Sequence, residues 1–135
     1  MIKANVGYGK GHYIARVEGH AGFAPKGQDI VCAGVSALTM ALYKAVSDFL
    51  GRDDAAYHLV ETGDGCFEIE VHGVLKHSVR AALGASFTMF VRGLRQIEKE
   101  YPGYLHVEQI IFTDKDEYDD TSEQTMKIER REGKG

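Results

Sequence analysis

The chain has 135 residues with 16 basic and 20 acidic side chains, and its net charge at pH 7 is −4. This length is sufficient for one domain with its own hydrophobic core. A content of 44% hydrophobic and 27% charged residues is typical of a globular protein, and the weak negative charge gives no indication of nucleic-acid binding. The uninterrupted apolar runs are short and no signal-peptide pattern is present, so a cytoplasmic protein without membrane contact is expected.

The first part of the chain predicts two strands, a loop and a helix. Apolar residues alternate moderately over 2–8 and 12–18, with glycines between these segments, which is typical of a β-hairpin. Glycines and a proline then interrupt regular structure over residues 19–28. Asp29 is a suitable N-cap, and apolar residues recur at spacings of three and four until Gly51, which predicts a long helix between them.

The second part predicts a hairpin, another helix and a last strand. Strands over 55–62 and 66–72 flank Gly63-Asp64-Gly65, which favours a tight turn. A helix is expected from about Ser78, as its cap, to about Tyr101, followed by a strand over 105–112. The order β-β-α-β-β-α-β predicts a single α+β domain with a mostly antiparallel sheet of about five strands and two long helices packed against it. Whether both helices cover one face of the sheet is left open.

The end of the chain differs in character from the rest. Residues 114–135 begin with an acidic run and end on Gly133-Lys134-Gly135. Such a segment buries little apolar surface, so we expect a folded domain over 1–113 and a largely disordered acidic tail over 114–135.

Cys32 falls in the first turn of the predicted helix, where unpaired backbone N–H groups favour negative charge. A cysteine nucleophile reacts as the thiolate, and a neighbouring histidine commonly takes its proton. His20 ends the strand before the glycine-rich loop, and that loop has to return the chain to the helix start. His20 and Cys32 are therefore a candidate catalytic dyad.

Polar and small residues around Cys32 suggest supporting roles. Backbone N–H groups near Cys32 offer a site for an oxyanion, and Ala33 and Gly34 leave room for a substrate backbone. Asp29 is interpreted as a helix cap rather than as a third catalytic residue. Ser36, one turn after Cys32, is interpreted as a supporting hydrogen-bonding group.

A competing interpretation treats the same residues as structural. Cysteine is among the most frequently buried residue types, and a single helical cysteine is commonly a small core residue. Spacing alone leaves both interpretations open. Cys66, the other cysteine, is predicted to be a half-buried strand residue. The sequence contains no CxxC, HxxxH or HxH spacing. His72 and His77, five residues apart across a strand–helix junction, are interpreted as surface or capping histidines, so neither a metal site nor a cofactor is expected.

Two sequence elements together resemble a known signature. Gly19-His20-Ala21-Gly22-Phe23 is followed by Gly27-Gln28-Asp29-Ile30-Val31-Cys32-Ala33 at the helix start. This pattern resembles the bacterial ribosomal-processing cysteine proteases, the Prp family, and the resemblance extends over roughly 1–112. It implies that His20 is the catalytic histidine and Cys32 the nucleophile, with Asp29 and Ser36 as accompanying polar positions.

The resemblance also implies a substrate and an assembly. The family removes a short N-terminal extension from large-subunit ribosomal protein twenty-seven, so a ribosomal protein precursor is the expected peptide substrate. A compact α/β fold, a homodimer and a mobile loop between histidine and cysteine are implied, with Gly22, Phe23 and Gly27 as the substrate loop. Two alternatives remain open: a phage-type protease that processes virion proteins, and a non-catalytic ribosome-associated binding module on the same scaffold.

Overall fold

The computed structural model describes residues 1–110 except 10, 26, 52–55, 62–64 and 75. Its elements are β1 (Ile2–Gly9), β2 (His12–Glu18), α1 (Ile30–Leu50), β3 (Ala56–Glu61), β4 (Cys66–His72), α2 (His77–Glu100) and β5 (Leu105–Ile110). The predicted β-β-α-β-β-α-β order and the α+β class are confirmed. The predicted acidic tail over 114–135, the end of the last predicted strand and most of the hairpin turn lie outside the described residues.

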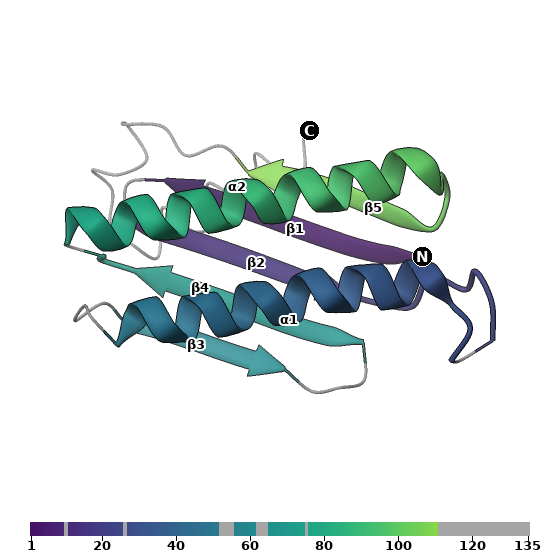
Figure 1. Cartoon of the computed structure of the whole chain (residues 1–135), viewed down its shortest axis with the longest axis horizontal. Coiled ribbons are helices and arrows are strands. Elements are labelled where there is room, and N and C mark those ends of the chain that lie inside the picture. Colours follow the sequence, from purple (N-terminus) through teal and green to yellow (C-terminus); the bar gives the residue numbers. More distant parts are fainter. Residues whose placement is uncertain (10, 26, 52–55, 62–64, 75, 111–135) are drawn as a thin grey trace.

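The strands form one mixed sheet in the order β3-β4-β2-β1-β5. The pairs β1–β2, β2–β4 and β3–β4 are antiparallel, whereas β1 and β5 run parallel. β2 lies in the middle of the sheet, and its pairing with β4 places Glu18 opposite Cys66 (Figure 1). The end of β2 and the start of β4 therefore meet at one end of the sheet, near the start of α1 (Figure 1).

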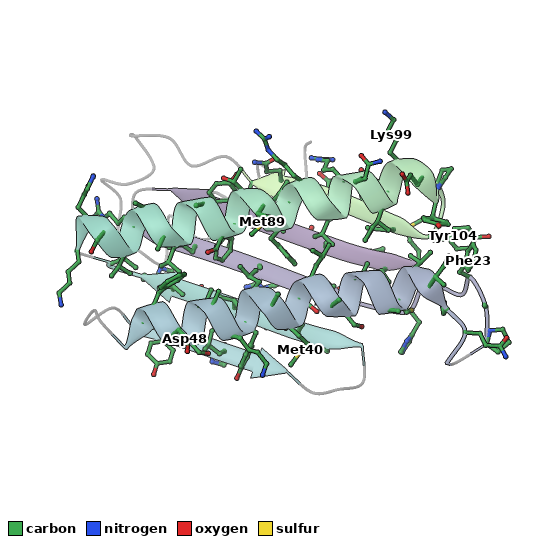
Figure 2. All side chains as sticks on the ribbon, viewed as in Figure 1. Phe23, Met40, Asp48, Met89, Lys99 and Tyr104 are labelled. Atoms are coloured by element: carbon green, nitrogen blue, oxygen red, sulfur yellow. The ribbon has the colours of Figure 1, made fainter. Side chains whose placement is uncertain are left out.

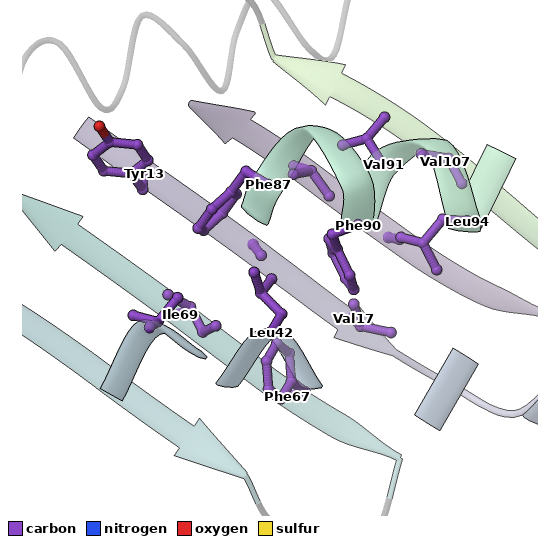
Figure 3. Close-up of a cluster of buried hydrophobic side chains, with 14 of the residues drawn as sticks. Tyr13, Val17, Leu42, Phe67, Ile69, Phe87, Phe90, Val91, Leu94 and Val107 are labelled. Carbon is purple, nitrogen blue, oxygen red and sulfur yellow. The ribbon is translucent and has the colours of Figure 1, made fainter. Parts of the chain in front are cut away.

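Both helices cover the same face of the sheet and lie side by side (Figure 1). Strand alternation supplies the core beneath them: in β4, Phe67, Ile69 and Val71 are buried, whereas the residues between them lie on the opposite, more exposed face. Side chains of the two helices pack onto these strand residues and complete the core. Figure 3 shows this for Leu42 of α1 and for Phe87, Phe90 and Leu94 of α2.

Glycines bring the two helices close together. A Cβ atom on Gly93 of α2 would lie 2.9 Å from Cδ1 of Leu38, and one on Gly34 of α1 would lie 3.3 Å from Cδ1 of Ile97. Gly34 thus faces α2, and the interpretation that it leaves room for a substrate backbone is corrected to a role in helix packing.

The helix starts differ in how they are capped. Asp29 caps α1 as predicted, since its side chain accepts a hydrogen bond from the first turn. The predicted Ser78 cap of α2 is wrong: α2 begins at His77, its N-cap is Lys76, and no side chain caps it. The chain is already helical at His77, so Ser78 lies inside the first turn.

Helix α1 is long and apolar enough, by length and composition, to cross a membrane. In this structure one stripe of it contacts the core instead. The buried residues of that stripe are Val31, Val35, Thr39, Leu42, Val46 and Leu50.

Candidate active site

The carboxylate of Asp29 joins the loop after β2 to the start of α1. Its Oδ1 atom accepts a hydrogen bond from the backbone N–H of Cys32 at 2.9 Å, and its Oδ2 atom accepts one from the N–H of Phe23 at 3.0 Å. The bond from Cys32, followed by the bond from Phe23, holds the pKa of Asp29 below its ordinary value of 3.8. The ionised cap therefore fixes both the first helical turn and the loop that precedes it.

Cys32 is half-buried, and its sulfur faces the same loop. Its Sγ atom accepts a hydrogen bond from the backbone N–H of Ala21 at 3.3 Å, and the side chain of Ala21 is buried. This hydrogen bond holds the sulfur against the loop that follows β2.

Cys66 lies nearby but in a different environment. Neither cysteine forms a disulfide, and Cys66 is exposed, so the prediction of a half-buried side chain is wrong. Cys66 is the first residue of β4 and pairs with Glu18, and the following residue, Phe67, is the one that turns into the core. Strand alternation therefore directs Cys66 away from the helices.

His20 follows β2 and lies against Gly65. The backbone N–H of Gly19 donates to the carbonyl of Gly65 at 2.9 Å, which draws the two segments together. A Cβ atom on Gly65 would lie 3.0 Å from both Cε1 and Nε2 of His20. Sequence reasoning missed Gly65, because its only signal was a hairpin glycine, and the contact arises from the pairing of β2 with β4.

His20 and Cys32 line one cleft of about 700 Å³ at this end of the sheet. Asp29, Ser36, Gly22 and Gly27 line the same cleft. The remaining lining residues are Ile2, Val17, Gly19, Ala24, Ala33, Val35, Thr39, Met40, Gly65, Cys66 and Phe67. Across the described part of this cleft, the imidazole of His20 forms no hydrogen bond with the thiol of Cys32 or with Ser36.

Phe23, the remaining residue of the predicted substrate loop, does not line the cleft. Its ring packs edge-on against Tyr101 and Tyr104, with centroid separations of 5.4 and 5.1 Å. Figure 2 shows Phe23 beside Tyr104, where α2 leads into β5. Phe23 therefore attaches the loop to the end of α2, while Gly22 and Gly27 border the open space.

The expected oxyanion donors around Cys32 are already engaged. The N–H of Cys32 donates to the carboxylate of Asp29, and the N–H of Ala33 donates to the carbonyl of Asp29 at 3.0 Å. The sequence-based assignment of these groups to an oxyanion site is thus not supported by the geometry. The N–H of Ala21, which approaches the sulfur, is the donor that the loop supplies in their place.

An α+β domain that places a free cysteine at a helix start and a histidine on the wall of the same cleft has the architecture of a small cysteine hydrolase. The family described as "Cysteine protease Prp" matches residues 1–106. The ribosomal processing cysteine protease Prp of Bacillus subtilis is 32% identical over 111 residues, covering 79% of this chain and 96% of that protein. The chain belongs to the Prp family of cysteine proteases.

Solved structures show the same fold. The Staphylococcus aureus ribosomal processing protease Prp with a covalently linked product peptide has a TM-score of 0.62 at 23% identity, covering 81% of this chain and 99% of that chain. The Streptococcus mutans protein SMU.848 has a TM-score of 0.61 at 26% identity, covering 83% and 96%. A second Staphylococcus aureus Prp structure, with a substrate peptide, has a TM-score of 0.58 at 21% identity, covering 81% and 99%.

Proposed function

We propose that this protein is a cysteine endopeptidase in which Cys32 is the nucleophile and His20 is the general base. The observation that carries the proposal is the shared cleft: both side chains line it, and the sulfur at the first turn of α1 accepts a backbone N–H. The imidazole rests against Gly65 at the cleft wall, and the His20 side chain is exposed, so we propose that it turns toward the sulfur when a substrate binds.

The reaction follows from these groups. His20 takes the proton of Cys32, and the thiolate attacks the carbonyl carbon of the scissile peptide bond. As the tetrahedral intermediate forms, the negative charge passes from the sulfur to the former carbonyl oxygen, and the N–H of Ala21, which lies beside the sulfur, is the proposed donor to that oxygen. His20 then protonates the leaving amine, and water releases the acyl group to restore the thiol.

The proposed substrate is the precursor of large-subunit ribosomal protein twenty-seven, from which the enzyme removes an N-terminal extension. The Bacillus subtilis relative is a ribosomal processing protease, and the Staphylococcus aureus relative was solved with substrate and product peptides. The cleft between the end of β2, the start of β4 and the start of α1 has room for an extended peptide.

Alkylation of the two cysteines tests the activation of Cys32. Cys66 is exposed and Cys32 is half-buried, so accessibility alone predicts faster labelling of Cys66. An activated dyad predicts the reverse order with iodoacetamide at neutral pH, and slower labelling of Cys32 in His20→Ala. The proposal fails if Cys66 labels faster and His20→Ala leaves both rates unchanged.

Cleavage of the extended precursor tests the enzyme against a binding module on the same scaffold. We expect one shortened product by mass spectrometry with the full chain and with Cys66→Ala, and none with Cys32→Ala. A binding module instead retains the precursor on a column without shortening it. Cleavage by Cys32→Ala overturns the assignment of the nucleophile.

We also propose that the protein acts in the cytoplasm as a homodimer. Neither cysteine forms a disulfide, which agrees with a reducing compartment. Met89 is 70% exposed on the outer surface of α2, where an apolar side chain suits a contact between copies (Figure 2). Light scattering coupled to size-exclusion chromatography measures the mass, and the mass of a single chain at all concentrations contradicts the dimer.

A further inference from the structure

A second group of reactive side chains lies on the sheet face that the helices leave uncovered. It consists of His12 at the start of β2 with Glu70 and His72 near the end of β4. These positions are at the opposite end of both strands from the pair Glu18 and Cys66, and Cys66 borders the cleft. The group is therefore separate from the candidate active site.

Strand pairing brings the three side chains together. Tyr13 pairs with Val71, so the next positions along the two antiparallel strands, His12 and His72, face each other, and their ring centroids are 4.0 Å apart. Glu70 lies two residues before His72 on the same face, and its Oε1 atom is 3.0 Å from Nε2 of His72. One ligand atom from each of the three residues lies within 4.8 Å of the others.

This ligand set matches the chemistry of a zinc ion. Two imidazole nitrogens and one carboxylate oxygen form a known Zn²⁺ donor set, with solvent in the fourth position. Zinc–ligand bonds of about 2.0–2.1 Å in a tetrahedral arrangement place the ligand atoms about 3.4 Å apart. The ligand atoms of His12, Glu70 and His72 lie within 4.8 Å of one another, so small side-chain rotations bring them to that separation.

The surroundings favour coordination over loose surface binding. His72 and Glu70 are 27% and 21% exposed, and Nε2 of His12 is shielded from solvent. An imidazole nitrogen binds a metal ion through its lone pair, so a shielded ring nitrogen beside a second imidazole and a carboxylate suits coordination. Two paired strands also hold the ligands more rigidly than loops would.

We propose that His12, Glu70 and His72 bind one Zn²⁺ ion, which ties the start of β2 to the end of β4. Its role is structural, because the site is remote from the cleft. No ligand spacing along the chain indicates this site, because His12 and His72 become neighbours only through strand pairing.

The same sheet contains a second histidine–glutamate pair, which serves as a control for the proposed zinc site. His106 and Glu108 on β5 are also two residues apart on one strand face, with Nε2 of His106 2.7 Å from Oε1 of Glu108. This pair provides one imidazole instead of two, and the His106 side chain is 53% exposed. A histidine–carboxylate contact alone is thus present in both places, and the second imidazole distinguishes the proposed site.

Zinc titration of the full chain tests the site directly. Cys32→Ala and Cys66→Ala are introduced together first, because thiolates also bind zinc. Calorimetry of this metal-free parent with Zn²⁺ should show one ion per chain. His72→Gln and Glu70→Gln should each weaken binding by about tenfold or more, and His106→Gln should leave it unchanged.

Thermal unfolding provides a readout that is independent of calorimetry. Zinc should raise the melting temperature of the parent and of His106→Gln, and should raise it much less in Glu70→Gln, whose side chain keeps the original shape. Glu70→Gln also answers the concern that His72→Gln fails to fold. Absence of zinc binding by the parent, or equal affinity in the parent and Glu70→Gln, overturns the proposal.

Discussion

His20 lies directly on Gly65, across the junction between the end of β2 and the start of β4. A single Cβ atom at Gly65 would come within 3.0 Å of two atoms of the imidazole and of the carbonyl oxygen of Gly19. The position of the proposed base is therefore defined by a glycine far from it in the sequence.

Gly65→Ala should displace the imidazole and reduce cleavage. Misplacing a catalytic group by about 1 Å typically costs up to about 100-fold in rate, so we expect a fall in kcat of about 10- to 100-fold. The backbone of Gly65 has φ +74°, so alanine there also costs about 1–2 kcal/mol of stability. Steady-state kinetics with the precursor measure the first effect, and urea unfolding measures the second.

Gly73→Ala is the matched control for backbone strain. Gly73 has φ +75°, but an added Cβ atom there meets nothing within 4 Å. We expect a similar loss of stability from the left-handed backbone with kcat preserved. Equal losses of kcat in the two variants would mean that the contact between Gly65 and His20 has no catalytic consequence.

Asp29→Asn should change how stability depends on pH. The folded pKa of Asp29 lies below its ordinary value of 3.8, chiefly because the N–H of Cys32 bonds to the carboxylate. The unfolded chain therefore binds this proton more readily, and the stabilisation is present above about pH 4 and lost as the pH falls through the folded pKa. Asparagine still caps but does not titrate.

Urea unfolding at about pH 5.5 and about pH 3 measures this difference. The wild-type chain should lose more stability than Asp29→Asn over that interval. Asp29→Ala, which removes the cap altogether, should be less stable than both at the higher pH. Parallel pH profiles for wild type and Asp29→Asn would contradict the hydrogen bonds assigned to the carboxylate.

Phe23→Ala should loosen the loop between His20 and Cys32. The ring makes edge contacts with Tyr101 and Tyr104, and aromatic pairs contribute about 0.5–1.5 kcal/mol each. Because these contacts hold the loop beside the cleft, we expect kcat/KM to fall about tenfold. Tyr57→Ala on β3 removes another exposed ring, one that is 59% exposed, and should leave kcat/KM unchanged.

Two glycines of α2 should respond in opposite ways to alanine. An added Cβ atom at Gly84 meets nothing within 4 Å, so Gly84→Ala should stabilise the protein by about 0.5–1 kcal/mol through helix propensity. At Gly93 the same atom would come within 2.9 Å of Leu38 on α1. Gly93→Ala should be at least about 1 kcal/mol less stable than Gly84→Ala by chemical denaturation. Equal stabilities would show that Leu38 moves aside without cost.

Local patterns predicted the elements well because their physical causes are local. Alternation of Phe67, Ile69 and Val71 with polar residues identified one face of β4, and Asp29 before an apolar periodic run identified the start of α1. The start of α2 was misplaced because Ser78 is a good cap by residue type, whereas the chain becomes helical one residue earlier.

Features of the site that depend on strand pairing could not be predicted from the sequence. The contact of His20 with Gly65 and the approach of His12 to His72 both require β2 to pair with β4, and nothing in either strand specifies that partner. The N–H of Cys32 was expected to serve an oxyanion, but the carboxylate that caps the helix already occupies it. Hydrogen-bond geometry, which residue types do not encode, decided between those roles.

The pairing of β2 with β4 also determines when the cleft can exist during synthesis. A nascent chain that has reached Leu50 contains His20, Asp29 and Cys32, but β4 and Gly65 have yet to be made. We therefore expect the growing polypeptide to present both reacting groups without the surface on which the imidazole rests. The order of translation thereby delays proteolytic competence until most of the domain has been made.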